Sequence, residues 1–315
     1  MKLSKKIWKI AVSIAERFHL EDSLSMIVRG KPLCAYKWSQ EELERVCMRN
    51  FTRDMGYSFD IRRPKTFNEK IQWYALFYNY EEISQASNKV SFKDFVSSKI
   101  GEGHVVPMYG HWDSVDGVRA EWDQFPDSFV LKGNMLFDDR GTMIIKDKSK
   151  VDVNKVIHIV KNWLNPRNTE LNNVFCNMYK GVKPELLVEE YVSDGNSRLT
   201  DYKFYCFDGD PYCLYVDFNG AISFFDIKWQ KLDVHYPNFP SIDVPLQKPP
   251  HFEDMIEAAK ILSKGFPFVR VDFYDTEDKY YVGEMTFNSG YGHRIFEPYS
   301  FDLTLGKKFV LPDNS

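Results

Sequence analysis

Hydrophobic residues near the start of the chain recur at three- and four-residue steps, which is the spacing of amphipathic helices. The pattern is clearest over residues 3–18, where lysines occupy the opposite face. A second helix is expected after Ser39, whose side chain suits the N-cap position, and others over residues 67–78 and 91–100. The pattern therefore predicts a helical N-terminal region.

After about residue 100 the pattern changes to short apolar runs of strand length, separated by helices. The dipeptides Asp208-Gly209 and Asn219-Gly220 interrupt aromatic runs and are typical of two-residue hairpin turns. This succession indicates an α+β fold, mostly antiparallel in its second half. The expected elements are strands over residues 105–109, 129–132, 143–145, 186–192, 268–274 and 280–287, and helices over 154–164 and 252–264.

Polar side chains gather on the last two expected strands. Alternate residues of a strand face the same side, so Arg270 shares a face with Asp272, and Glu284 shares one with Thr286. The polar turn between the strands predicts that they pair, which brings the two carboxylates together. Neighbouring carboxylates repel unless a cation lies between them, and a divalent cation with oxygen ligands fits. The arginine beside them suits a phosphate oxygen. The alternative is an exposed, salt-bridged sheet face.

Two upstream segments carry residues that suit a nucleotide. Lys132 ends an apolar strand just before a loop, from which its ammonium can reach phosphates. The alternative is a strand-end lysine that extends to solvent. Glu189 and Glu190 precede Tyr191 and Val192 at the end of another apolar strand. A strand end of this kind can bind the edge of an adenine through its backbone and a ribose through a carboxylate. The alternative is a strand that ends in two solvated acids.

In this order the segments resemble the TupA-like ATP-grasp family of surface-polysaccharide gene clusters. The resemblance implies an ATP-grasp fold in which two α+β subdomains clamp ATP. Its expected divisions are a helical N-terminal region (1–85), a first subdomain with the segment before it (86–195), and a second subdomain with the metal site (196–315). The residues that carry the resemblance are 65–73, 129–132, 188–192, 201–209, 266–274 and 283–287.

The resemblance also implies a role for each site residue. Arg270 would stabilise the transferred phosphoryl group, and Lys203 would lie near the phosphates as a second catalytic residue. The Mg²⁺ ligands would be Asp272, Glu284 and Thr286, the last at a position where this family usually has threonine. The acceptor substrate would face Asn288, His293 and Arg294. The ATP-binding residues would be Lys89, Lys132, Glu189, Glu190, Tyr191, Val192 and Lys203.

The reaction implied is ATP- and magnesium-dependent ligation of a carboxylate to an amine through an acylphosphate. In a polysaccharide cluster it would add an amino acid or small amine to a uronic-acid-type sugar or glycan. Three alternatives stay open: a kinase that acts on a glycan hydroxyl, a non-catalytic nucleotide- or glycan-binding homologue, and a glycosyltransferase. The last would use Asp208 and Asp210 as a metal motif, although Asp208-Gly209 is better explained as a hairpin turn.

One segment departs from the family pattern. The loop over residues 133–141 lacks the usual histidine and has bulky residues in place of glycines. It also carries Asp138 and Asp139, which repel phosphate unless Arg140 compensates. Backbone N–H groups hold phosphate less readily in such a loop. We therefore expect an altered substrate or reduced activity.

Charge and cysteine content narrow the setting of the protein. A net charge of −4 argues against nucleic-acid binding. The five cysteines lack zinc-site spacing and indicate free thiols in a reducing cytoplasm. No apolar run reaches the roughly 20 residues needed to span a bilayer. The basic amphipathic helix over residues 3–18 either packs on the protein core or lies on an anionic membrane, which would place the protein at the inner face of the plasma membrane.

Overall fold

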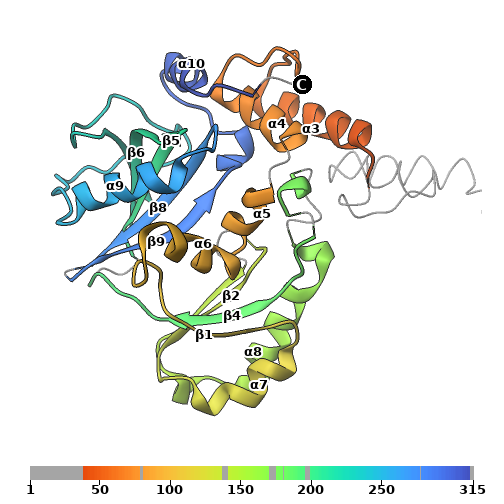
Figure 1. Cartoon of the computed structure of the whole chain (residues 1–315), viewed down its shortest axis with the longest axis vertical. Coiled ribbons are helices and arrows are strands. Elements are labelled where there is room, and N and C mark those ends of the chain that lie inside the picture. Colours follow the sequence, from red (N-terminus) through yellow and green to blue (C-terminus); the bar gives the residue numbers. More distant parts are fainter. Residues whose placement is uncertain are drawn as a thin grey trace, which may run out of the picture.

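The computed structural model describes residues 38–78, 81–136, 141–169, 175–179, 181–195, 199–276 and 278–312. The expected helix over residues 3–18 lies outside these ranges, as do residues 137–140 of the loop after Lys132. A four-stranded and a five-stranded sheet form two lobes, both sheets being antiparallel (Figure 1). The predicted α+β class is confirmed.

The first part of the described chain is helical, as predicted. Ser39 caps the first helix. Its side chain accepts a hydrogen bond from the backbone N–H of Glu42, and the Glu42 carboxylate accepts one from the backbone N–H of Ser39. Thr66 and Glu69 make the same reciprocal arrangement at the second helix. The helices are α3 (Gln40–Met55), α4 (Phe67–Phe77), α5 (Glu81–Ser87) and α6 (Ser91–Ile100).

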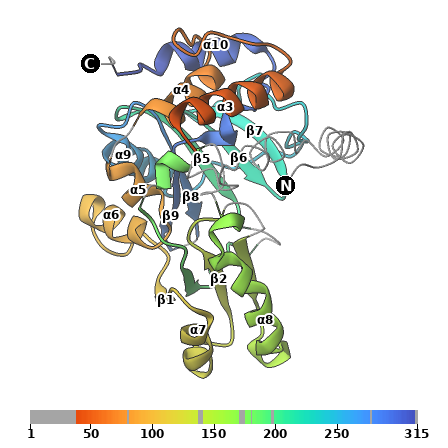
Figure 2. The ribbon, with the colours of Figure 1, turned by 90° about the vertical axis from the view of Figure 1, so that its right-hand side faces the viewer.

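The four-stranded sheet is the core of the smaller lobe, and its helices α7 and α8 lie at the far end from α3 and α4 (Figure 2). The strand expected over residues 105–109 begins only at Met108, and Val105 instead forms an isolated bridge to Val282. The sheet order is β1 (Met108–Trp112), β4 (Leu186–Glu190), β2 (Phe129–Gly133), β3 (Thr142–Ile145), with helices α7 (Val115–Glu121) and α8 (Val153–Val160).

The five-stranded sheet contains both predicted hairpins. Asp208, Gly209, Asn219 and Gly220 have the positive φ angles that a type I′ turn requires. Helix α9 (Phe252–Ser263) packs on the face that carries Phe204 and other apolar side chains. The sheet order is β7 (Ala221–Asp226), β6 (Asp210–Phe218), β5 (Asp201–Phe207), β8 (Val269–Asp275), β9 (Tyr280–Thr286), and α10 (Tyr299–Lys308) follows.

Short 3₁₀ helices complete the fold. The end of the helix expected over residues 154–164 is one of them, since α8 gives way to 3₁₀ geometry after Val160. In the described ranges every helix is too short or too polar to cross a bilayer. The 3₁₀ segments are Trp122–Gln124, Lys148–Lys150, Lys161–Leu164, Pro166–Asn168, Cys176–Tyr179 and Ser289–Gly292.

Three of the five cysteines are described as side chains, and all three are buried free thiols. Cys213 is paired with Tyr205 rather than with Cys206, so the two cysteines beside the first hairpin are not directly opposite each other. Burial raises the pKa of the Cys47 thiol to about 12, which keeps it protonated at neutral pH. The prediction of free thiols is confirmed for Cys47, Cys206 and Cys213.

Candidate functional site

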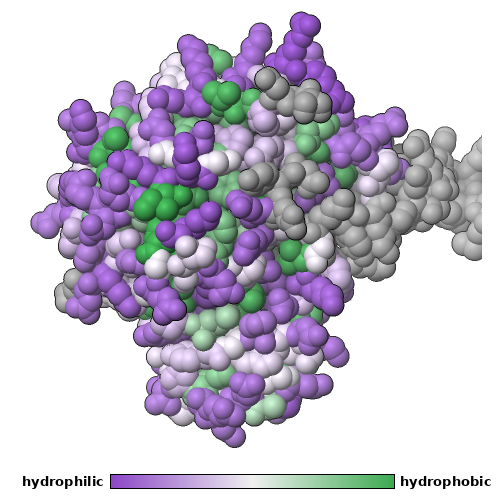
Figure 3. All heavy atoms as spheres, viewed as in Figure 1, coloured by the Kyte–Doolittle hydropathy of each residue, from purple (hydrophilic) through white to green (hydrophobic). Residues whose placement is uncertain are grey.

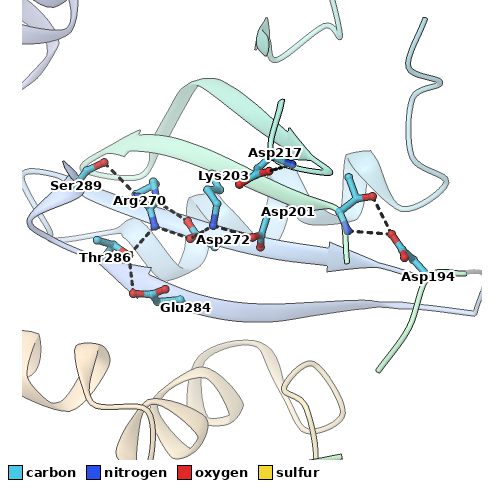
Figure 4. A network of polar contacts seen from close by, with 11 residues as sticks. Asp194, Asp201, Lys203, Asp217, Arg270, Asp272, Glu284, Thr286 and Ser289 are labelled. Atoms are coloured by element: carbon cyan, nitrogen blue, oxygen red, sulfur yellow. Dashed lines mark hydrogen bonds and ion pairs between the residues drawn. The ribbon is translucent and has the colours of Figure 1, made fainter. Parts of the chain in front are cut away.

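The central strand of the site is β8. Asp272 is paired with Glu284 on β9 and with Lys203 on β5. Arg270, two residues earlier on the same face, is paired with Thr286. These side chains therefore converge on one side of the sheet, opposite α9 (Figure 4). The predicted pairing of the two carboxylate-bearing strands is confirmed.

A β-bulge shapes this part of the sheet. Asp272 is opposite Glu284, but the next residue of β8 is opposite Val282, so Gly283 is the extra residue of β9. A Cβ on Gly283 would lie 2.6 Å from the ring of Tyr274. A side chain at the position before Glu284 would therefore displace this ring.

Asp272 is held by two cations in the interior. Its carboxylate accepts from Arg270 through Nε at 2.7 Å and Nη2 at 2.6 Å. The Lys203 ammonium lies 2.8 Å from the same carboxylate, and Asp272 is only 1% exposed. Burial acts to raise the pKa of Asp272, but Arg270 and Lys203 outweigh it and hold the carboxylate in its charged form.

Asp201 is part of this network and was missed in the sequence. Its carboxylate lies 3.1 Å from the Lys203 ammonium, and its other oxygen has no hydrogen-bond partner among the described residues. Burial raises the pKa of Asp201. Burial acts to lower the pKa of Lys203, but the two carboxylates around it outweigh this effect and raise the value. The alternation of Asp201 and Lys203 on one strand was the available signal, since both must face the same side.

Glu284 is less constrained than Asp272. Among the described residues its carboxylate accepts only from the Thr286 hydroxyl, at 3.0 Å, and that hydroxyl accepts from Arg270 Nη2 at 3.0 Å. Beyond it, Asn288 is buried and its side-chain nitrogen lacks a partner among the described residues. The strand ends therefore leave a half-buried carboxylate and an amide with free bonding capacity.

The donor set suits magnesium held together with a nucleotide. Mg²⁺ in such sites takes one or two carboxylates, and phosphate oxygens and water supply the other ligands. Asp272 and Glu284 provide two carboxylates, with the Thr286 hydroxyl beside them. In the described part of the chain no cluster of three or more His, Cys, Asp or Glu side chains could hold a metal alone. A metal here would depend on the phosphates.

A second charged cluster lies where α6 meets the small sheet. Glu189 is 5% exposed and is held between Lys132, at 2.5 Å, and Lys93, at 2.6 Å. Burial acts to raise the pKa of Glu189, but the two lysines outweigh it and lower the value to about 2. Burial also lowers the pKa of Lys93, which donates to the Val106 carbonyl oxygen at 2.5 Å. Glu189 therefore binds the lysines and is not open to solvent.

The other residues expected around ATP lie apart from this cluster. Lys89 donates to the Leu136 carbonyl oxygen at 2.7 Å, whereas Lys93, one helical turn later, reaches Glu189. Glu190 is exposed, and the Tyr191 ring lies 5.9 Å from the Lys146 ammonium. Val192 follows, half-buried. Their roles toward a nucleotide stay predictions.

The segment after β9 has an unusual backbone. Gly290, Tyr291 and Gly292 have φ angles of 56°, 56° and 64°, which form a left-handed turn. Tyr291 is strained there because it carries a Cβ, and such strain is concentrated at functional sites. The turn begins beside Arg270, whose Nη1 lies 3.4 Å from the Ser289 hydroxyl.

The residues expected to face the acceptor substrate begin at this turn. His293 Nδ1 lies 2.8 Å from the carboxylate of Asp54 on α3, and burial lowers the pKa of the imidazole. Arg294 is exposed, with its guanidinium 4.7 Å from the centre of the Phe239 ring. Both, like Asn288, stay predictions as substrate contacts.

Comparison with known proteins points to one family. The model of the family described as TupA-like ATPgrasp matches residues 69–310. No curated protein matches the sequence. Similar solved structures include a D-alanine–D-alanine ligase from Bacillus anthracis, with 16% identity, a TM-score of 0.43, and 72% of this chain and 68% of that chain covered.

Two other solved structures are similar at the same level. For an N5-carboxyaminoimidazole synthetase from Staphylococcus aureus complexed with ADP, the identity is 16%, the TM-score 0.39, and the coverage 68% of this chain and 50% of that chain. For a D-cycloserine synthetase, the identity is 14%, the TM-score 0.40, and the coverage 72% of this chain and 70% of that chain. The present chain thus spans only half the length of the Staphylococcus aureus enzyme.

Proposed function

The chain belongs to the TupA-like ATP-grasp family and has the ATP-grasp fold, and on this premise we propose that it is an ATP- and magnesium-dependent carboxylate–amine ligase. The observation that carries the proposal is the buried arrangement on β5, β8 and β9. There Asp272 and Glu284 are opposite each other, and Arg270 and Lys203 bind Asp272 from two sides. Charges placed in this way before the reaction suit phosphoryl transfer, which depends on positioning and electrostatic stabilisation.

Lys132 and Lys93 are the proposed phosphate contacts. Both ammonium groups are paired with Glu189 and have little access to water. Phosphate oxygens of ATP would compete for the same donors, so nucleotide binding would loosen the lysines from Glu189. Glu189 then keeps them charged and in position until ATP arrives. This proposal assigns the second phosphate contact to Lys93, whereas the family resemblance implied that role for Lys89.

Asp272, Glu284 and Thr286 are the proposed magnesium ligands. When bound, the ion would neutralise the phosphate oxygens and fix their orientation. The substrate carboxylate attacks the γ-phosphorus, ADP leaves, and an acylphosphate forms. An amine nitrogen then attacks the acyl carbon and inorganic phosphate leaves with the loss of a proton. Arg270 stabilises the charge on the moving phosphoryl group, and Lys203 fixes Asp272 in its ionised form.

A uronic-acid-type sugar or glycan is the proposed carboxylate substrate, with an amino acid or small amine as the second. Support comes from Arg294, an exposed guanidinium that lies 4.7 Å from the Phe239 ring centre and 5.8 Å from that of Tyr236. A guanidinium suits the carboxylate of such a sugar, because its planar fork matches a carboxylate in two bonds. By contrast, Asp208 accepts from the Gly265 backbone in a hairpin turn, and this structural role argues against a glycosyltransferase metal motif.

Product analysis tests the proposal. ADP release should require ATP, Mg²⁺, a uronic acid and an amine together, and hydroxylamine should intercept the acylphosphate as a hydroxamate. ADP release with a sugar that lacks a carboxylate would favour a kinase. Binding of ATP with Mg²⁺ at about 100 times its Kd should stabilise the fold by about 2.7 kcal/mol. Stabilisation by UDP-sugars but not by ATP would refute the proposal.

The cytoplasm, with its ATP pool, is the proposed location. Attachment to the inner face of the plasma membrane would depend on the basic amphipathic residues 3–18. Flotation of the full chain with anionic liposomes tests this, with a variant in which the lysines of that segment are changed to glutamine as the control. Equal flotation of both proteins, or none of the wild type, would exclude the proposed attachment.

A further inference from the structure

A cavity lies on the face of the large sheet that is opposite Asp272. It has a volume of about 400 Å³ and is lined by α9 and the residue before it, the end of α6 and the loop after it, and the start of β9 with the residue before it. Asp275 lies three positions after Asp272 on β8, and an odd offset along a strand places it on the opposite face, toward α9. Tyr280 is paired with Asp275 and therefore faces the same side. The cavity is therefore separate from the proposed ATP site, and its size is that of a small-molecule site.

One side of the cavity is apolar. Ile261 on α9 is 48% exposed, although α9 otherwise buries its large hydrophobic residues, and Ile100 from α6 lines the same space. Figure 3 shows a patch of hydrophobic side chains where α9 approaches the end of α6. The ring of Tyr280 adds an aromatic surface, with the His104 ring stacked on it at 4.7 Å between centres.

The polar groups in the cavity are incompletely bonded. His251 Nδ1 is hydrogen-bonded to the Asp275 carboxylate at 2.6 Å, which fixes the orientation of the ring. The other ring nitrogen, Nε2, makes no bond to the described residues. His104 Nδ1 is buried and has no partner among them either. A buried polar atom without a partner costs free energy, which a ligand with a complementary group would recover.

The charge in the cavity is mainly negative. Asp254 and Glu257 are three residues apart on α9, so both lie on the helix face that lines the cavity. Asp254 makes no ion pair with the described residues, and burial together with the Asp254 charge raises the pKa of Tyr280. Glu257 forms an ion pair with Lys260, which does not line the cavity. Lys279 is the one lysine among the lining residues. A cation is therefore favoured over an anion.

We propose that this cavity binds a small organic cation, in which a primary ammonium is attached to an aromatic or apolar body. The ammonium pairs with Asp254 and Glu257, and the body packs between Ile100, Ile261 and the Tyr280 ring. A metal ion is the poorer occupant, because no three His, Cys, Asp or Glu side chains of the described ranges are placed to hold one. The two imidazoles border the body and offer hydrogen bonds to a polar substituent where the body carries one.

Binding of phenethylammonium to the full chain tests the proposal. Phenethyl alcohol and 3-phenylpropionate serve as a neutral and an anionic probe of similar shape. The imidazole proton signals of His104 and His251, assigned with His→Gln variants, report occupancy by NMR. We expect both signals to move with phenethylammonium, and the ammonium to bind at least about tenfold more tightly than the alcohol, a difference that corresponds to 1.4 kcal/mol.

Matched variants then locate the charge. Each of Asp254→Asn and Glu257→Gln should weaken phenethylammonium binding about fivefold, the upper end for exposed ion pairs. Glu253→Gln removes the same charge from the same helix at a residue that does not line the cavity, and should leave binding unchanged. Equal affinity for the ammonium and the alcohol, equal loss in the Glu253 variant, or histidine signals that stay unmoved at millimolar probe would each overturn the proposal. None of these measurements depends on turnover of ATP.

Discussion

Replacement of Glu189 by glutamine tests the buried lysine–glutamate–lysine cluster. The carboxylate has a pKa of about 2 against an ordinary 4.5, a difference that corresponds to about 3 kcal/mol of stabilisation of its charged form. The substitution also leaves Lys93 in the interior without a counterion, which costs about 3–5 kcal/mol when one partner of a buried pair is removed. These are two descriptions of one interaction, so Glu189→Gln should lower the free energy of unfolding by about 3 kcal/mol.

Urea unfolding at pH 7 measures this loss. Glu190→Gln is the matched control, because it makes the same chemical change one residue along the same strand at an exposed side chain. We expect the control to change the free energy of unfolding by no more than about 0.5 kcal/mol. In a background that already carries Lys93→Met, the cost of Glu189→Gln should be smaller, since only Lys132 then loses its partner. Equal effects of Glu189→Gln and Glu190→Gln would refute the reasoning.

The pH dependence gives an independent check with a defined sign. Glu189 has a folded-state pKa below its unfolded value, so its contribution is complete above about pH 4.5 and is lost as the pH falls toward 2. The difference in unfolding free energy between the wild type and Glu189→Gln should therefore shrink as the pH is lowered from 5 to 3. A difference that stays constant over this range would mean that the carboxylate charge is not its source.

Three further substitutions probe other parts of the structure. Glu284→Gln should abolish ATP-dependent ADP release and leave the melting temperature nearly unchanged, because the carboxylate is half-buried and, among the described residues, accepts one bond, from Thr286. Full activity would exclude Glu284 from the proposed metal site. Gly283→Ala should lower the free energy of unfolding by about 1–3 kcal/mol in urea denaturation, because its Cβ would lie 2.6 Å from the Tyr274 ring, and an unchanged midpoint would contradict this contact. Burial raises the pKa of Asp302 to about 6, so the folded protein keeps a proton that the unfolded chain loses near pH 4. The free energy of unfolding should therefore decrease as the pH rises from 4 to 6. Asp302→Asn should flatten that part of the stability–pH curve, and an identical slope in both proteins would assign the dependence elsewhere.

Local chemistry accounts for the parts of the fold that the sequence predicted well. Ser39 and the Asp208-Gly209 and Asn219-Gly220 dipeptides act through their own backbone neighbours, and their helix cap and hairpins are confirmed. The start of β1 at Met108, later than the expected residue 105, has a local cause. Val105 and Val106 suit a strand, but Pro107 has no N–H for the ladder, so pairing with β4 begins at Met108.

The parts of the site that were missed depend on contacts between distant segments. Lys93 is one charged residue on a short helix, and nothing in its neighbours distinguishes it from a solvated lysine. Its partner Glu189 lies nearly a hundred residues later, and only the tertiary fold brings the two charges together. By contrast, Asp272 and Glu284 are on consecutive strands joined by a short turn, where alternation alone predicts their meeting.

The helices before the sheets hold the strained turn after β9 in place. Asn68 and Gln72 of α4 donate to the carbonyl oxygens of Arg294 and Tyr291, at 2.8 Å and 2.6 Å, while α3 binds His293 through Asp54. The α4 backbone also approaches so closely that a Cβ on Gly292 would lie 2.7 Å from the Asn68 carbonyl oxygen. An exchange of residues 38–78 for the equivalent helices of a relative would therefore alter this turn as well. The helices and this turn therefore form one structural unit, and we expect either to be exchanged only together with the other.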